Sequence, residues 1–231
     1  MKTKFLKIAL GITLGVVIFE IGLQLISASD AAKVFPIIRP NLGNPDWQIG
    51  YNFAPGTVAR WSNENRALVE INSMSFRDWE YNLEPALNVY RIALSGDSIT
   101  EALQVENEYT YENLAEKRLQ ERGFDVEILN FSMSGNGPLQ QLVRLETSAQ
   151  RFHPDVYLMM FSVGDFLTGE LLDASNHPAY KISDDGKVVR SYEFQNRAAL
   201  RYVNTDIAQS FLFIIRNIET IRMLYYLKNQ T

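Results

Sequence analysis

The sequence predicts an α/β fold, a three-layer α/β/α sandwich built on a parallel sheet, preceded by a helix that could cross a membrane. Three short apolar runs, at residues 89–95, 126–130 and 156–161, have the length of buried strands. Helical patterns separate them, at residues 107–122 and 138–151. Alternating strands and helices favour parallel strands joined by right-handed crossovers, with the first strand in the middle of the sheet.

The amino-terminal segment is predicted to be a membrane anchor. Lys2, Lys4 and Lys7 precede an apolar stretch at residues 8–26, which as a helix would span about 28 Å of a hydrocarbon layer about 30 Å thick. Basic residues before the span favour a cytoplasmic amino terminus, so we expect the main domain on the outer side, periplasmic or extracellular. A cleaved signal peptide is the competing interpretation, because Ser27-Ala28-Ser29 offers small residues for cleavage.

Composition divides the chain and excludes some functions. Residues 1–30 hold the anchor or signal segment, residues 31–85 a Pro- and Asn-rich connector with short strands, and residues 86–231 the α/β domain, which we expect to be incomplete at its carboxyl terminus. A net charge of −5 argues against a nucleic-acid partner. The sequence contains no cysteine, which excludes disulfides, thiol catalysis and cysteine-ligated zinc. We expect no cofactor and no metal.

Two elements are expected in the carboxyl-terminal part. Asp184-Asp185-Gly186 lies between β-prone runs and predicts a hairpin within residues 181–194. Apolar residues at three- and four-residue intervals predict an amphipathic helix over residues 206–228. This helix could pack on the domain, on a membrane or on sequence outside this chain.

Ser98 is the first candidate for chemistry. The strand at residues 89–95 stops at Gly96-Asp97-Ser98, and ligands of open α/β sheets bind at the carboxyl ends of strands. Gly96 permits a sharp turn that would bring the Ser98 hydroxyl to the rim of the sheet. The alternative is an ordinary strand-to-helix turn, in which Asp97 or Ser98 caps the next helix.

Two later loops point to the same rim. The second strand runs into Asn130-Phe131-Ser132-Met133-Ser134-Gly135, and the third runs into Ser162-Val163-Gly164-Asp165. With these blocks the chain resembles the SGNH/GDSL family of serine ester hydrolases over residues 71–166. The resemblance implies a flavodoxin-like sandwich, with Ser98 as the nucleophile, in a block that includes Asp97, and the Gly135 amide in the oxyanion hole.

The match departs from the family at two places. Asp165 falls on the family aspartate, but Gly164 stands where the family has an asparagine that donates to the oxyanion. The family's D-x-x-H block, which supplies the base and its orienting carboxylate, is absent. Asp173 and His177 have the right chain order for a rearranged dyad, with a surface-loop histidine as the alternative. His153 precedes the third strand, and is expected to be structural or exposed at the opposite end of the sheet.

A segment before the first strand carries a further resemblance. Ile71 to Asp78 is similar to an N-S-x-G-F-R-D stretch of membrane-tethered members of the family, with Ser75 where glycine is usual. Arg77 could hold a substrate anion, with a surface or structural ion pair as the alternative.

Two functions are compatible with these observations. One is a membrane-tethered serine esterase or acyl transferase, acting on ester bonds of a small molecule or an extracytoplasmic glycan. The other is a noncatalytic module that keeps the fold and binds an acylated glycan or a protein partner. Because the base and one oxyanion donor are missing, we expect weak or no turnover from this chain.

Overall fold

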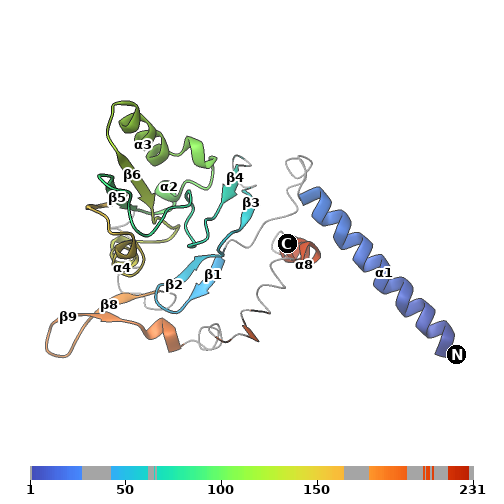
Figure 1. Ribbon diagram of the computed structural model, residues 1–231. Helices are drawn as coiled ribbons and strands as arrows, with labels where there is room; N and C mark the ends of the chain where they lie inside the picture. Colours follow the sequence, from blue (N-terminus) through green and yellow to red (C-terminus); the bar gives the residue numbers. More distant parts are fainter. Residues whose placement is uncertain are drawn as a thin grey trace.

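The structure is a computed structural model of the 231-residue chain. It describes residues 2–27, 43–61, 65, 67–163, 177–196, 205, 207–208, 210 and 218–228. Figure 1 shows a mixed α/β domain, with a long helix, α1, extending away from it.

The centre of the domain is a three-stranded parallel sheet. Its strands are β5 (Tyr90–Ser95), β6 (Val126–Asn130) and β7 (Val156–Met159), in the order β6-β5-β7. Ile92 pairs with Ile128 on one side and with Val156 on the other, and both pairings are parallel. The prediction of three parallel strands with the first in the middle is therefore confirmed. The third strand ends two residues earlier than predicted.

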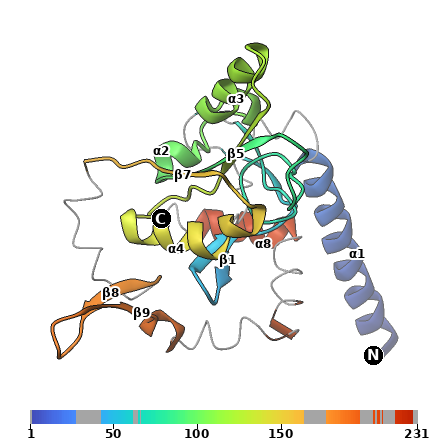
Figure 2. The same ribbon diagram turned by 60° about the vertical axis from the view of Figure 1, so that its left-hand side comes forward.

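A helix packs on each face of this sheet, α3 (Tyr111–Glu121) on one and α4 (Pro138–Thr147) on the other. Alternate strand residues point to opposite faces, so two separate apolar clusters form. One joins β5 and β6 to α3; the other joins them to α4 and the following 3₁₀ helix η3 (Ala149–Phe152). Figures 1 and 2 show both helices on the sheet, and the complete three-layer sandwich stays a prediction.

The helices that connect the strands are each interrupted once. The predicted helix at residues 107–122 is a 3₁₀ turn, η2 (Asn107–Tyr109), followed by α3, because Thr110 takes an extended conformation with ψ 150°. The predicted helix at residues 138–151 is likewise divided into α4 and η3.

Short antiparallel pairs surround the sheet. Before it come β1 (Gly43–Asp46) with β2 (Gly50–Phe53), and β3 (Val58–Arg60) with β4 (Leu68–Glu70). After it comes the predicted hairpin, β8 (Ala179–Ile182) with β9 (Val188–Ser191), followed by the turn η5 (Glu193–Asn196). Gly186 in the hairpin turn has φ +78°, which glycine adopts without strain.

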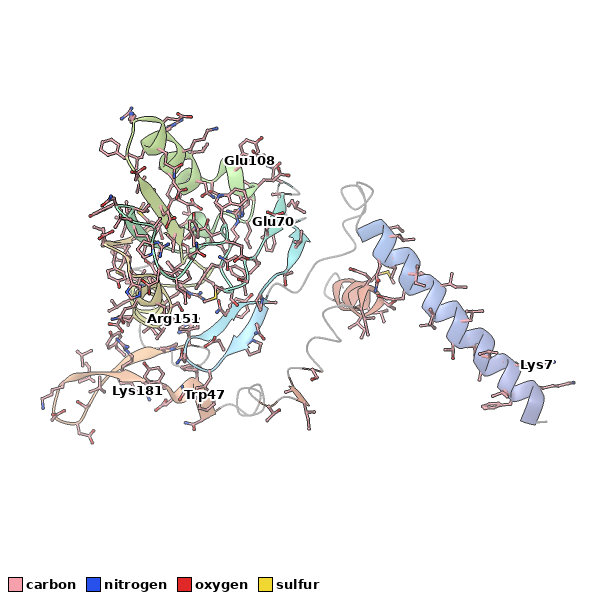
Figure 3. All side chains as sticks on the ribbon, viewed as in Figure 1. Lys7, Trp47, Glu70, Glu108, Arg151 and Lys181 are labelled. Atoms are coloured by element: carbon pink, nitrogen blue, oxygen red, sulfur yellow. The ribbon has the colours of Figure 1, made fainter. Side chains whose placement is uncertain are left out.

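The amino-terminal helix α1 (Lys2–Ser27) is long and apolar enough to cross a membrane. Its window Lys4–Ile26 has a mean hydropathy of 2.1, and none of it is buried in the protein. Figure 3 places Lys7 near the end of α1 that lies away from the domain. By length and composition, α1 is either an anchor or a signal sequence.

The carboxyl-terminal helix α8 (Glu219–Lys228) is shorter than predicted. Residues 207, 208 and 210 are also helical, but the chain is not helical at Ile218, so a continuous helix over residues 206–228 does not form. The other residues between 206 and 217 lie outside the described part of the chain. The helix α8 begins at Glu219 because the carboxyl group of Glu20 accepts hydrogen bonds from the first amides of α8.

Candidate active site

The turn after β5 places Ser98 at the rim of the sheet. Ser98 is exposed and begins the short helix α2 (Ser98–Glu101). Asp97 caps this helix, since its Oδ1 accepts the Ile99 amide hydrogen at 2.9 Å. The two alternatives considered from the sequence are therefore both present in this turn: Asp97 caps the helix, and Ser98 stays exposed.

Gly96 is required at this turn by close packing. A Cβ atom added to Gly96 would lie 2.3 Å from Thr100 Oγ1 and 2.6 Å from Thr100 Cβ, far inside contact distance. Only glycine lets α2 fold back so tightly on the end of β5. Each residue of the Gly-Asp-Ser sequence therefore has its own structural role. Gly96 allows the close approach, Asp97 caps α2, and Ser98 presents an exposed hydroxyl.

The loop that carries Gly135 is tied to the same turn. The Phe131 amide donates to the Leu94 carbonyl at 2.7 Å, and the Met133 amide donates to the Gly96 carbonyl at 3.2 Å. Gly135 follows two residues later, exposed, with φ +77°. Ser98 and Gly135 thus belong to two segments joined by a backbone hydrogen bond at the carboxyl end of the sheet. Their catalytic roles stay a prediction.

Asn130 is the buried residue that fixes this loop. Its Nδ2 donates to the Thr100 carbonyl at 3.0 Å and to Glu112 Oε1 at 2.6 Å, while its Oδ1 accepts the Ser132 amide hydrogen at 2.9 Å. One side chain therefore connects α2, α3 and the loop. A buried amide satisfied in this way holds its neighbours in one arrangement.

The segment before β5 supports the loop that carries Gly135. Asp78 is buried, and its two oxygens accept the Trp79 amide at 2.8 Å and the Asn130 amide at 2.6 Å. Burial raises the pKa of Asp78 well above its usual range, although the two amide hydrogen bonds act in the opposite direction. Ser75, at the position where the related motif has glycine, has φ +72°, a conformation that glycine adopts without strain.

Arg77 is buried, whereas the sequence suggested a contact with a substrate anion or a surface or structural ion pair. It is 2% exposed, not a surface residue, and its Nη2 donates to the Val105 carbonyl. Its Nε and Nη1 have no hydrogen-bond partner among the described residues. Burial lowers the pKa of Arg77, and the nearby Glu112 and Asp78 act in the opposite direction. Arg77 is therefore a buried cation beneath the loop, without an ion pair within the part of the chain that the structure describes.

A second polar cluster at this rim was not anticipated from the sequence. Ser134 Oγ donates to the buried Glu101 Oε2, and Glu101 lies near the fully buried Arg144. Burial raises the pKa of Glu101 and lowers that of Arg144 to about 10. Arg144 also donates to Asn52 Oδ1 and to the Tyr51 carbonyl, both at 3.1 Å. The signal that the sequence offered for this cluster was Glu101, an acidic residue three positions after Ser98.

His177 is held by an amide instead of a carboxylate. Gln140 Nε2 lies 3.0 Å from His177 Nδ1 and donates to the Pro178 carbonyl at 2.9 Å, while Gln140 Oε1 accepts the Gly137 amide at 3.1 Å. With its oxygen used in this way, Gln140 presents an N–H to Nδ1, while the Pro178 carbonyl lies 3.3 Å from the same nitrogen and would accept a proton from it, so the contacts of Nδ1 fit either tautomer. A histidine that deprotonates a serine needs the tautomer protonated at Nδ1, usually held by a carboxylate, and here Nδ1 meets an amide and a carbonyl instead.

The other expected site residues are distributed as follows. His153 is exposed, carries φ +50° and lies 3.2 Å from Glu84, at the start of β7 and thus at the end of the sheet opposite Ser98. Asp173, Gly164 and Asp165 lie outside the described residues. Within the described ranges, no group of three or more His, Asp or Glu side chains could hold a metal ion.

Comparisons with known proteins add little to this site. No family model matches the chain, and no curated protein matches it. A crystal structure of TesA is similar to part of it, at 28% sequence identity with a TM-score of 0.31. That similarity covers 33% of this chain and 43% of the TesA chain, so the chain spans less than half the length of the structure it matches.

Proposed function

We propose that this chain carries a serine ester-hydrolase site of the SGNH/GDSL type on a membrane-anchored domain, with Ser98 as the nucleophile. The observation that carries the proposal is the hydrogen bond from the Met133 amide to the Gly96 carbonyl. It holds the Gly135 loop against the turn that presents Ser98. The substrate class is an ester, and esterase or O-acyl transfer chemistry on an extracytoplasmic glycan fits the tether.

The expected chemistry is attack of Ser98 Oγ on an ester carbonyl. The new bond forms between Oγ and the carbonyl carbon as the C=O π pair moves onto the oxygen, and the amides of Ser98 and Gly135 would stabilise this negative oxygen. When the carbonyl re-forms, the ester C–O bond breaks, the alcohol leaves with a proton, and the acyl group stays on Ser98 until water removes it. The serine proton needs an acceptor, because a neutral serine is a weak nucleophile near neutral pH. Within the described residues His177 Nδ1 contacts the Gln140 amide and the Pro178 carbonyl, so no carboxylate there orients the ring as a base. Turnover should therefore be slow.

The membrane part of the proposal concerns α1. We infer that α1 remains attached as an anchor, with the domain on the outer side of the membrane. Alkaline carbonate extraction should leave the protein in the membrane pellet, and mass spectrometry should find residues 8–26 in the mature chain. A soluble product that starts near Ser29 would contradict this inference and identify α1 as a signal peptide.

The test of the catalytic proposal is hydrolysis of p-nitrophenyl acetate by the detergent-solubilised full chain. We expect a slow rate above buffer that disappears in Ser98→Ala. The matched control is Ser183→Ala in the β8–β9 hairpin, which should keep the full rate. Equal rates for Ser98→Ala and the unchanged chain would contradict the assignment of Ser98.

A noncatalytic binding module is the second candidate, and the Gln140–His177 contact favours it. The two candidates differ in their response to His177→Ala. A robust rate that both Ser98→Ala and His177→Ala abolish would identify a rearranged dyad. No Ser98-dependent turnover, together with retained binding of an acetylated oligosaccharide by Ser98→Ala, would identify a binding module.

A further inference from the structure

The acidic residue within the apolar helix α1 has a specific partner. Glu20 Oε1 accepts the Glu219 amide hydrogen at 2.7 Å, and Glu20 Oε2 accepts the amide and hydroxyl hydrogens of Thr220 at 2.9 and 2.7 Å. Gln24 Nε2 adds a fourth hydrogen bond at 3.0 Å. The first amides of a helix have no partner within the helix. Glu20 therefore caps α8 across nearly two hundred residues of sequence.

The position of Glu20 along α1 sets the depth of this contact. The membrane-length window ends at Ile26, six residues after Glu20. At 1.5 Å per residue, Glu20 lies about 9 Å inside the end of the span. Amphipathic helices that lie in a membrane interface are embedded about 5–10 Å into the boundary between headgroups and acyl chains. The first turn of α8 is therefore at the depth of an interfacial helix.

The orientation and the surface of α8 agree with this depth. In Figure 1 α8 is seen nearly along its axis while α1 lies across the view, and in Figure 2 α8 runs across the view to the left of α1, steeply inclined to it instead of parallel. A helix so steeply inclined to a membrane span runs along the membrane plane. Ile221 and Leu224, three residues apart on one face, are 37% and 57% exposed, so this apolar face is left uncovered by the described residues.

We propose that α8 is an interfacial membrane helix, docked on the anchor by the Glu20 carboxyl group, with Ile221 and Leu224 in contact with lipid. The helix lies in the leaflet at the Ile26 end of the span. The partner of this surface is the lipid bilayer itself. The proposal depends on retention of α1 but not on ester hydrolysis, so its failure and that of the catalytic proposal are separable.

The absence of native cysteines allows a single-site fluorescence test. Leu224→Cys and, as the control, Ile182→Cys on the β8–β9 hairpin are labelled with bimane in the full chain. Each is reconstituted in phosphatidylcholine vesicles, and quenching by brominated phosphatidylcholine is compared with quenching by aqueous iodide. We expect lipid quenching at position 224 and iodide quenching at position 182. Iodide quenching at position 224 equal to that at 182 would overturn lipid contact, and so would protection from both quenchers.

The role of Glu20 is tested in the Leu224→Cys background. Glu20→Leu should insert at least as well as the native span, since it removes a polar group from the membrane. Loss of the cap should raise iodide quenching at position 224 about fivefold, and Thr220→Val should raise it less. Thr13→Val is the control, because the Thr13 hydroxyl bonds only within α1, to the Ala9 carbonyl. Unchanged quenching in both Glu20→Leu and Thr220→Val would overturn docking by Glu20, as would a mature chain that begins after Ile26.

Discussion

Replacement of Asn130 by alanine should destabilise the protein and loosen the Gly135 loop at the same time. Asn130 is 3% exposed and makes three side-chain hydrogen bonds, to Thr100, Glu112 and Ser132. In Asn130→Ala the carbonyl of Thr100, one oxygen of Glu112 and the amide of Ser132 all lose their partner.

The size of the effect follows from these three bonds. A neutral hydrogen bond contributes about 1 kcal/mol net, and a bond to a carboxylate about 1.5–3 kcal/mol. Two bonds of the first kind and one of the second give a loss of about 4 kcal/mol in the free energy of unfolding. For a chain of this length each kcal/mol lowers the melting temperature by about 2–4 °C. We therefore expect Asn130→Ala to melt about 8–16 °C lower.

The assay is thermal unfolding of the full chain in non-ionic detergent, followed by near-ultraviolet circular dichroism. Asn82→Ala is the matched control, because Asn82 is exposed and a surface substitution of this kind changes stability by less than about 0.5 kcal/mol. A melting temperature for Asn130→Ala within 2 °C of that of Asn82→Ala, about the effect of 1 kcal/mol, would refute the role given to Asn130.

Three further outcomes are expected from the same melting assay. Ser75→Gly should stabilise by about 0.5 kcal/mol, since relief of the positive φ exceeds the entropy cost of glycine, whereas Ser75→Ala should not stabilise at all. Gly96→Ala should cost about 1–3 kcal/mol, because the new Cβ collides with α2, and a neutral effect would contradict the close packing. Burial raises the pKa of Asp78 above its ordinary value of 3.8, so the folded state holds this proton more tightly, and stability should fall as pH rises from about 4 through the folded pKa. Asp78→Asn should flatten that fall in a pH series, and parallel profiles for the two proteins would show that Asp78 does not cause it.

The sheet was predictable because its signals are local. Each strand is a short apolar run, and each crossover carries a helical pattern, so order and direction followed from the connection rules. The helix interruptions were not predictable in the same way. Thr110 leaves the helix in an extended conformation, and α8 starts anew at Glu219 because of a carboxyl group on α1. Periodicity within one segment carries no information about such a distant cap.

The site was predictable in part for a similar reason. The turn at Gly96, Asp97 and Ser98 follows from backbone sterics and capping, which act over a few residues. The Glu101–Ser134 pair and the amide beside His177 depend on which side chains meet across the fold. The burial of Arg77 belongs to the same class, since a charged residue in a loop gives no local sign that the chain will cover it.

The bond from the Asn130 amide to Asp78 also sets a limit on how short a folding fragment of this protein can be. A fragment that starts at β5 would expose Phe131, which stacks edge to face on Phe76 at 4.5 Å between ring centroids, and would leave the Asn130 amide unpaired. It would also leave Arg144 buried without the acceptors on Asn52 and Tyr51. Soluble versions for expression should therefore begin at or before Gly43, ahead of β1, even though the residues that carry the proposed chemistry start at Ser98.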